Sequence, residues 1–147
     1  MTTLPFQLIT FDGVALEGQA ASLSVPTSDG EITVLPHHVP LVTLIEAGEA
    51  KLTLVKDGKP RQHFFAVGAG FLEVSHAGTA LLTRTAEPLE AIDEQRVRAA
   101  IANAEQRLKE LADQKAAGDE REVAETSALL ARNLARLGVV RRRRHRS

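Results

Sequence analysis

Short apolar runs separated by turn residues fill the first part of the chain, up to about residue 85. Runs of this kind, bounded by glycine, proline or aspartate, are typical of antiparallel strands. Besides a short strand that begins at Gly30, the segments expected to be strands are residues 4–11, 15–25, 41–45, 47–55, 61–67, 71–75 and 79–85. The Asp57-Gly58 dipeptide predicts a tight hairpin turn, because both of its residues accept a positive φ. About eight strands in this length favour an antiparallel β-sandwich, or flattened barrel.

Two prolines, Pro36 and Pro40, interrupt an apolar run and predict a rigid corner between two short strands. Each proline fixes its own φ near about −65°, lacks a backbone donor and biases the preceding residue toward extended geometry. Leu35 and Val39 are therefore not expected within a helix. Gly30 supplies a conformationally permissive entry to this segment.

The hydrophobic period changes from that of a strand to that of a helix after Pro88. Two apolar stripes with alternating spacings of four and three follow: Val97, Ile101, Ala104, Leu108 and Leu111, then Val123, Ser127, Leu130, Leu134 and Leu137. With Gly118-Asp119 between the stripes and Gly138 after the second, they predict an antiparallel two-helix hairpin. Small residues in both stripes limit the buried area, which favours a hairpin that can open.

These patterns divide the chain into a β-sandwich domain over residues 1–88, a helical hairpin over residues 89–140 and a basic tail over residues 141–147. The 147 residues, 44% apolar and 25% charged, have the composition of a globular protein. No apolar run approaches the ~18 residues that a membrane span requires. No basic segment precedes a long apolar stretch near Met1, so we expect a chain that remains in the cytoplasm.

Candidate catalytic and metal-binding groups are few. The absence of cysteine from the sequence excludes disulfides, thiolate catalysis and cysteine-ligated metals. His37 and His38 are adjacent, so in an extended chain their side chains point to opposite sides and cannot share one ion. Gly68-Ala69-Gly70 lacks the lysine of a phosphate loop and the third glycine of a dinucleotide fingerprint. No carboxylate pairs with a histidine for acid–base work, so we predict no metal site and no enzyme activity of the chain alone.

Charge is distributed unevenly along the chain. Residues 1–88 hold five Lys/Arg against nine Asp/Glu, whereas residues 89–147 hold thirteen against ten. The excess in the second part comes from five terminal arginines: Arg141, Arg142, Arg143, Arg144 and Arg146. Such a tail can bind nucleic acid or an acidic protein partner, or remain solvated without a target, and composition leaves these alternatives open.

The proline corner has the pattern Gly-Glu-x-x-x-Leu-Pro-x-His-x-Pro-Leu, which begins at Gly30. Together with the β-rich unit and a hairpin that opens with Ile92-Asp93-x-x-Arg96, it resembles the epsilon subunit family of bacterial F-type ATP synthases. The resemblance extends from residue 1 to about residue 140. It implies a ten-stranded flattened sandwich in a non-catalytic subunit of the rotating central stalk, peripheral to the cytoplasmic face of the plasma membrane.

For partners, the resemblance implies a subunit that bridges the gamma subunit and the polar loops of the membrane rotor ring, and so couples ion-driven rotation to ATP synthesis. Glu31 matches an acidic residue on the ring-facing loop, and His38 matches the histidine of the corner pattern. With Pro40, they are expected to form one binding face for gamma and the rotor ring.

In some family members the hairpin inhibits ATP hydrolysis by extending along gamma to the alpha and beta subunits, and it folds down when ATP binds. The residues that match the family's nucleotide site are Glu87, Ile92, Asp93, Arg96, Arg132 and Arg136. Val97 stands where alanine is usual, and Asn103 stands at a usually basic position. Each lost charge-assisted contact costs about 1.5–3 kcal/mol, so ATP is expected as a weak regulatory ligand and no cofactor is required. The five tail arginines are expected to add inhibitory contacts to the beta subunits.

The competing interpretation is a stand-alone adaptor or nucleic-acid-binding module that combines a β-sandwich, a helical arm and a basic tail. No other basic face accompanies the tail, so nucleic acid is not the expected partner. Salt-sensitive retention on DNA or RNA without affinity for gamma would distinguish this alternative.

Overall fold

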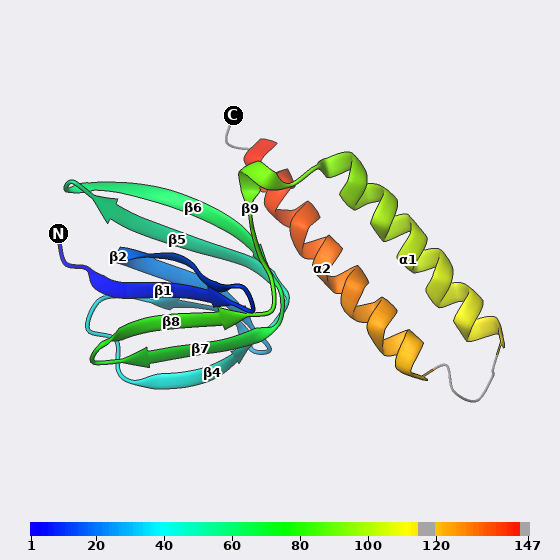
Figure 1. Cartoon of the computed structure of the whole chain (residues 1–147), viewed down its shortest axis with the longest axis horizontal. Helices are drawn as coiled ribbons and strands as arrows, with labels where there is room; N and C mark the ends of the chain where they lie inside the picture. Colours follow the sequence, from blue (N-terminus) through cyan, green and yellow to red (C-terminus); the bar gives the residue numbers. More distant parts are fainter. Residues whose placement is uncertain (115–119, 145–147) are drawn as a thin grey trace.

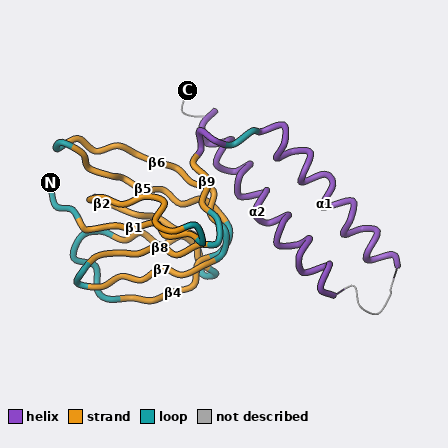
Figure 2. Tube along the Cα trace, viewed as in Figure 1, coloured by secondary structure: helices purple, strands orange, loops and turns teal. Residues whose placement is uncertain are grey.

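The computed structural model describes residues 1–114 and 120–144, in which nine strands precede a short 3-10 helix and two long helices (Figure 1). The strands are β1 (Leu4–Thr10), β2 (Gly13–Thr27), β3 (Gly30–Val34), β4 (Leu41–Ile45), β5 (Gly48–Lys56), β6 (Lys59–Val67), β7 (Gly70–Ser75), β8 (Gly78–Thr83) and β9 (Ala86–Pro88). The helices are η1 (Leu89–Ala91), α1 (Glu94–Gln114) and α2 (Glu120–Arg144). Figure 2 shows the strands gathered in one body and the two long helices lying side by side next to it.

All strands belong to one sheet, in the order β4-β7-β8-β1-β2-β5-β6-β9 with β3 paired to β2. The pairs are antiparallel, except that β1 and β8 run parallel. The 15-residue strand β2 pairs with β1 and, toward its end, with β3 and β5, so it joins the two halves of the sheet. The sheet folds over itself as a flattened sandwich (Figure 1). The predicted fold class is confirmed, although the described residues form nine strands where the resemblance implies ten.

The core of the sandwich follows the alternation of side chains along each strand. In β1, Leu4, Phe6 and Leu8 are buried, while Pro5 and Gln7 between them are exposed. Four fully buried leucines from four other strands complete the centre of the core: Leu23, Leu52, Leu72 and Leu81. Each fully buried apolar side chain contributes about 1.5–3 kcal/mol, so this core stabilises the sandwich strongly.

The proline corner forms the turn between β3 and β4, as the sequence predicts. The backbone N–H of His38 donates to the carbonyl oxygen of Leu35 at 3.1 Å. His37 has a φ of 67°, a conformation that few residues other than glycine adopt. With a proline on either side, this turn has little conformational freedom.

Helix α1 begins and packs as predicted. The Oδ1 atom of Asp93 accepts the backbone N–H groups of Gln95 and Arg96 at 3.1 and 3.3 Å, which is an N-cap. The buried residues of α1 are Val97, Ala104 and Leu111, seven positions apart, with the two intervening members of the predicted stripe half-buried.

Helix α2 differs from its predicted stripe and from its predicted end. Leu134 is 48% exposed and Val123 is 37% exposed, whereas Asn133 is only 1% exposed. The helix also continues through Gly138 to Arg144. Its last turns bury two adjacent valines, and burial of each contributes more than the roughly 0.5–1 kcal/mol that a helical glycine costs.

The hairpin docks on the sandwich through α2. Helix α2 contacts β5, β6 and η1, and α1 packs on α2 as the outer helix (Figure 1). The Gly118-Asp119 turn predicted between the helices lies outside the described residues. Among the described residues, neither long helix is apolar enough over a sufficient length to cross a membrane.

Candidate functional site

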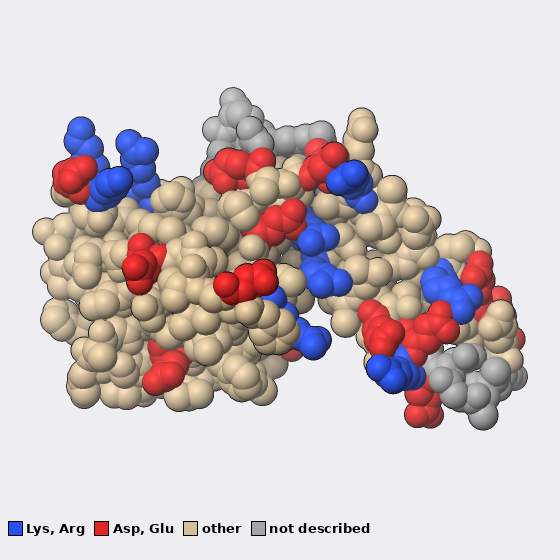
Figure 3. Space-filling model, in the orientation of Figure 1, with Lys and Arg blue, Asp and Glu red and all other residues tan. Residues whose placement is uncertain are grey.

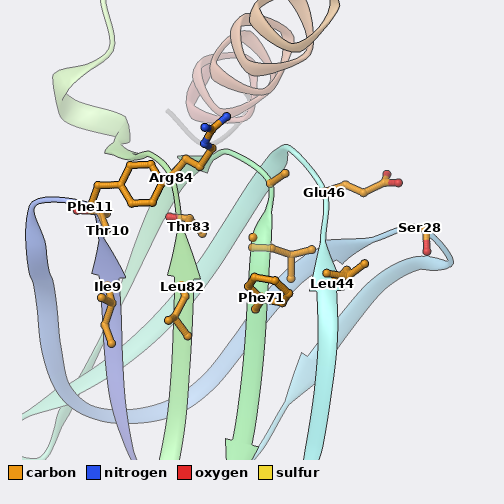
Figure 4. Close-up of a pocket in the computed structure, with 13 residues that line it drawn as sticks. Ile9, Thr10, Phe11, Ser28, Leu44, Glu46, Phe71, Leu82, Thr83 and Arg84 are labelled. Carbon is orange, nitrogen blue, oxygen red and sulfur yellow. The ribbon is translucent and has the colours of Figure 1, made fainter. Parts of the chain in front are cut away.

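Five exposed or half-buried apolar side chains form a continuous row across five neighbouring strands. Strand pairing places Val14 opposite Ile9, Ile9 opposite Leu82, Leu82 opposite Phe71, and Phe71 opposite Leu44. Figure 4 shows four of them, from Ile9 to Leu44, on adjacent strands at the same level. We refer to these five residues as the apolar row.

The apolar row is open to solvent in the isolated chain. Leu44 is 65% exposed, Phe71 is 52% exposed and Val14 is 54% exposed. The row borders a hollow of about 600 Å³, at whose edge the Arg84 guanidinium lies 5.7 Å from the centre of the Phe11 ring. Figure 3 shows that most of the visible surface of the sandwich is uncharged, and that charged side chains gather where the hairpin meets the sandwich and at the far end of the hairpin. An exposed apolar surface of this continuity is typical of a binding surface.

Sequence reasoning missed the apolar row, although the sequence carries a signal for it. An antiparallel strand with one solvated face alternates between apolar and polar residues, whereas a strand covered on both faces is apolar throughout. The segment Leu41–Ile45 has apolar residues at four of five positions, and Phe71-Leu72 and Leu81-Leu82 are adjacent apolar pairs. These pairs place one side chain in the core and the other in the row.

The structure separates the three residues that were expected to form one partner-binding face. Glu31 lies at the start of β3, whereas His38 and Pro40 lie beyond the other end of that strand. His38 and Pro40 line a cavity of about 410 Å³ that also includes His76. Strand β3 lies between Glu31 and the other two residues, and their binding to gamma and the rotor ring stays a prediction. No cluster of metal-ligating side chains occurs in the part of the chain that the structure describes.

The predicted nucleotide residues are only partly brought together. The Nε atom of Arg136 lies 2.5 Å from the Oε2 atom of Glu87, so α2 and β9 are joined by an ion pair. Arg136 also donates through Nη1 to the Oδ1 atom of Asn133 at 3.1 Å. Asp93 accepts hydrogen bonds from its own helix. Ile92 is half-buried just before α1.

Arg96 and Arg132 are not part of the Glu87–Arg136 ion pair, and each lies in a different environment. Arg96 is exposed in the first turn of α1. Arg132 lines a cleft of about 660 Å³ between α2 and three sandwich loops, opposite Arg84. Its Nε atom is buried and has no hydrogen-bond partner among the described residues. A buried guanidinium donor favours an anionic acceptor in this cleft.

The described part of the basic tail continues α2. The Nη1 atom of Arg142 lies 2.8 Å from the Oε1 atom of Glu49 on β5, and Arg141 is exposed. The side chains of Arg143, Arg144 and Arg146 lie outside the described residues. Of the two tail arginines whose side chains the structure describes, Arg142 is therefore paired with the sandwich.

The amino-acid sequence is similar to those of known proteins. The family model for the "ATP synthase, Delta/Epsilon chain, beta-sandwich domain" matches residues 3–89. The ATP synthase epsilon chain of Shouchella clausii (strain KSM-K16) is 40% identical over 108 residues, which are 74% of this chain and 78% of that relative. The ATP synthase epsilon chain of Exiguobacterium sp. (strain ATCC BAA-1283 / AT1b) is 34% identical over 110 residues, which are 75% and 79% of the two chains.

Solved structures share the fold at lower identity. A chain of the Euglena gracilis mitochondrial ATP synthase OSCP/F1/c-ring structure matches with a TM-score of 0.71 and 22% identity, covering 89% of this chain and 77% of that one. A chain of the Tetrahymena thermophila mitochondrial ATP synthase central stalk/c-ring structure matches with a TM-score of 0.53 and 13% identity, covering 93% and 97%. The family model and the similarity to bacterial relatives show that the chain belongs to the epsilon chains of F-type ATP synthase.

Proposed function

We propose that this chain couples rotation of the rotor ring to ATP synthesis by bridging the gamma subunit and the ring, and that its hairpin inhibits ATP hydrolysis. As an epsilon chain it is a non-catalytic subunit of the ATP synthase. The two similar solved structures are an F1/c-ring assembly and a central stalk with its ring, which supports the proposed place in the complex. We further propose that the subunit is peripheral to the cytoplasmic face of the plasma membrane.

The apolar row carries the proposal for gamma binding. A strand surface with Leu44 and Phe71 both more than half exposed is costly in water and gains stability when another protein covers it. Its residues come from paired strands of one sheet, so their backbone is already ordered and little backbone freedom is lost on binding. We assign this row to gamma, because a permanently assembled stalk needs an apolar, preformed interface.

The two ends of the sandwich are assigned to different contacts. We propose that the loop at Glu31 contacts the polar loops of the rotor ring. The opposite end, with His38 and Pro40, then faces away from the ring and toward gamma. Glu31→Gln should reduce binding to the isolated ring and leave binding to gamma unchanged.

Binding to gamma can be tested with one substitution made at two places. Leu44→Ser removes an apolar side chain from the row, and Leu134→Ser removes one of similar exposure from the hairpin. Full burial of a leucine contributes about 1.5–3 kcal/mol, so the loss at this 65% exposed site should be about 1–2 kcal/mol, or roughly 5- to 30-fold in Kd. Calorimetry with purified gamma should show weakening for Leu44→Ser alone. Equal affinities of both variants would refute the assignment.

We propose ATP as a weak ligand of the cleft at Arg132 that favours the docked hairpin. The alpha and beta subunits would be contacted only by the extended hairpin. The support is the buried Nε atom of Arg132 without a partner among the described residues. Because Arg136 is paired with Glu87, fewer phosphate contacts are free than the resemblance implies, which agrees with weak affinity. Arg132→Gln should weaken ATP binding in calorimetry. Unchanged binding would place the nucleotide elsewhere.

A further inference from the structure

The end of α2 is attached to the sandwich by two ion pairs. Arg142 pairs with Glu49 on β5 at 2.8 Å, although the two residues are 93 positions apart in the chain. Arg136 pairs with Glu87 on β9 at 2.5 Å. Both pairs join a guanidinium of the hairpin to a carboxylate of the sandwich, so both exist only while the hairpin is docked.

Apolar burial accompanies these pairs at the same end of α2. Leu137 is 7% exposed, Val139 is 1% exposed and Val140 is 8% exposed, although Gly138 between them is open to solvent. Helix α2 contacts β5 and β6 and contributes these buried residues, whereas the middle of the helix exposes Leu129 and Leu134. The last turns of α2 are therefore the part of the hairpin that fixes it to the sandwich.

The two members of the Arg142–Glu49 pair differ in their surroundings. The Glu49 side chain is 9% exposed and belongs to a strand, whereas the Arg142 side chain is 59% exposed and ends a helix. A carboxylate that is mostly removed from water depends on nearby cations more than a surface carboxylate does. Undocking the hairpin would remove the Arg142 guanidinium from the largely buried Glu49 carboxylate. The ion pair therefore favours the docked arrangement.

We propose that Glu49 and Arg142 form a clasp that holds the hairpin on the sandwich, so that the basic tail stabilises the docked state. The sandwich supplies the carboxylate and the tail supplies the cation. The effect on ATP hydrolysis rests on the proposed inhibitory role of the hairpin, but the clasp itself does not.

The clasp reverses the expected effect of the tail. The charge of the tail led us to expect that its arginines deepen inhibition through contacts with the beta subunits, so their removal should weaken inhibition. The clasp predicts that removal of Arg142 releases the hairpin and strengthens inhibition. Added salt should act in the same direction, because it screens the partly exposed pair. The sign of the Arg142→Gln effect therefore separates the two roles.

The docked state can be measured in the isolated full-length chain, which has no cysteine of its own. Spin labels on Lys59→Cys in β6 and Asp113→Cys in α1, both exposed positions, report the distance between sandwich and hairpin by pulsed electron resonance. Arg142→Gln and Glu49→Gln should each increase the undocked fraction by roughly 2- to 10-fold. The double variant should add little to the larger single effect, because both changes break one pair.

Arg121→Gln is the matched control, since Arg121 is 90% exposed and, among the described residues, its ion pair is with Glu125 of the same helix at 3.1 Å. It removes the same charge from the same helix and should leave the distance distribution unchanged. If Glu49→Gln disturbs the sandwich, seen as a lower urea midpoint, the exposed Arg142 variant still decides the question. Distance distributions that are identical for Arg142→Gln and Arg121→Gln would overturn the clasp.

A second measurement separates the clasp from the proposed function. Catalytic head depleted of its native epsilon subunit should hydrolyse ATP roughly 2- to 10-fold more slowly with the Arg142→Gln chain than with the unchanged chain. Increased undocking without any change in hydrolysis would support the clasp and refute the inhibitory role of the hairpin. Weaker inhibition by Arg142→Gln, with unchanged docking, would overturn the clasp and support contacts with the beta subunits.

Discussion

Asn133 is a buried polar residue in α2, and its replacement by alanine tests whether polar contacts hold the hairpin in place. It is 1% exposed. Its Nδ2 atom donates to the carbonyl oxygen of Leu129 at 2.9 Å, and its Oδ1 atom accepts from Nη1 of Arg136 at 3.1 Å. Arg136 in turn pairs with Glu87 of β9. Asn133 therefore orients the guanidinium that joins the hairpin to the sandwich.

The expected magnitude follows from these contacts. Removing the acceptor of a charged donor costs about 1.5–3 kcal/mol, and the cavity left by the amide adds about 1 kcal/mol. Alanine regains about 0.6 kcal/mol through its higher helix propensity, and Arg136 keeps Glu87 as a partner. We therefore expect Asn133→Ala to favour hairpin opening by about 1–3 kcal/mol, or roughly 5- to 150-fold.

Hydrogen exchange measured by mass spectrometry reports this opening directly. Peptides from α2 should exchange faster in Asn133→Ala, whereas peptides from β1 and β8 should keep their rates, because the sandwich core is unchanged. Asn103→Ala makes the same substitution at an exposed position of α1 and should slow exchange slightly through helix propensity. Equal exchange rates of α2 in the two variants would refute the role of Asn133.

Two glycine substitutions and one ion pair give further predictions. Gly70→Ala would place a Cβ atom 1.9 Å from the carbonyl oxygen of Leu82, whereas Gly138→Ala meets nothing within 4 Å. Urea unfolding should show Gly70→Ala destabilised by about 3 kcal/mol or more and Gly138→Ala stabilised by about 0.5–1 kcal/mol; shifts of the same sign would contradict the packing. Arg107 joins the helices through Glu122, at 2.6 Å. Arg107→Gln should speed hydrogen exchange at the end of α1 more than Arg121→Gln does, and equal effects would count against the pair. The hydrogen bonds that Arg107 donates to Glu122, and then to Glu110, raise the pKa of Arg107. Its contribution to stability is therefore present below the ordinary pKa of arginine and should not change between about pH 7 and pH 10.

The sequence predicts the sandwich well because its strands are short, alternating and separated by turn residues. Asp57-Gly58 forms the hairpin turn between β5 and β6, and both residues have positive φ, as a type I′ turn requires. The corner at Pro36 and Pro40 is likewise predicted from local sequence, because each proline fixes its own φ. Local signals decide these features, so no knowledge of distant contacts is needed.

The seam of α2 could not be predicted from spacing, because it depends on two surfaces. One face of α2 packs on α1, while Val139 and Val140 at its end pack on the sandwich. Because α2 packs against both surfaces, its orientation buries Asn133 and exposes Leu134. A single apolar stripe in the sequence predicts one packing face of a helix and does not reveal a second one.

The candidate binding sites could not be predicted as reliably, because they combine residues whose distance in space the sequence does not give. The resemblance placed Glu31 and His38 on one binding face because both match family positions, whereas in the structure strand β3 lies between the two residues. The adaptor and nucleic-acid interpretation is not supported, since the chain belongs to a family of ATP synthase subunits. The nucleotide residues and the partner face remain predictions that binding experiments can decide.

The most direct test of the proposed function is ATP hydrolysis by catalytic head depleted of its native epsilon subunit, with either the full chain or a version that ends at Pro88. The shorter version keeps β9 and the apolar row, and its binding is confirmed before hydrolysis is measured. We predict that both versions bind and that only the full chain suppresses hydrolysis. Suppression by neither version despite binding would refute inhibition by the hairpin, and absence of binding by the full chain would contradict the central-stalk function itself.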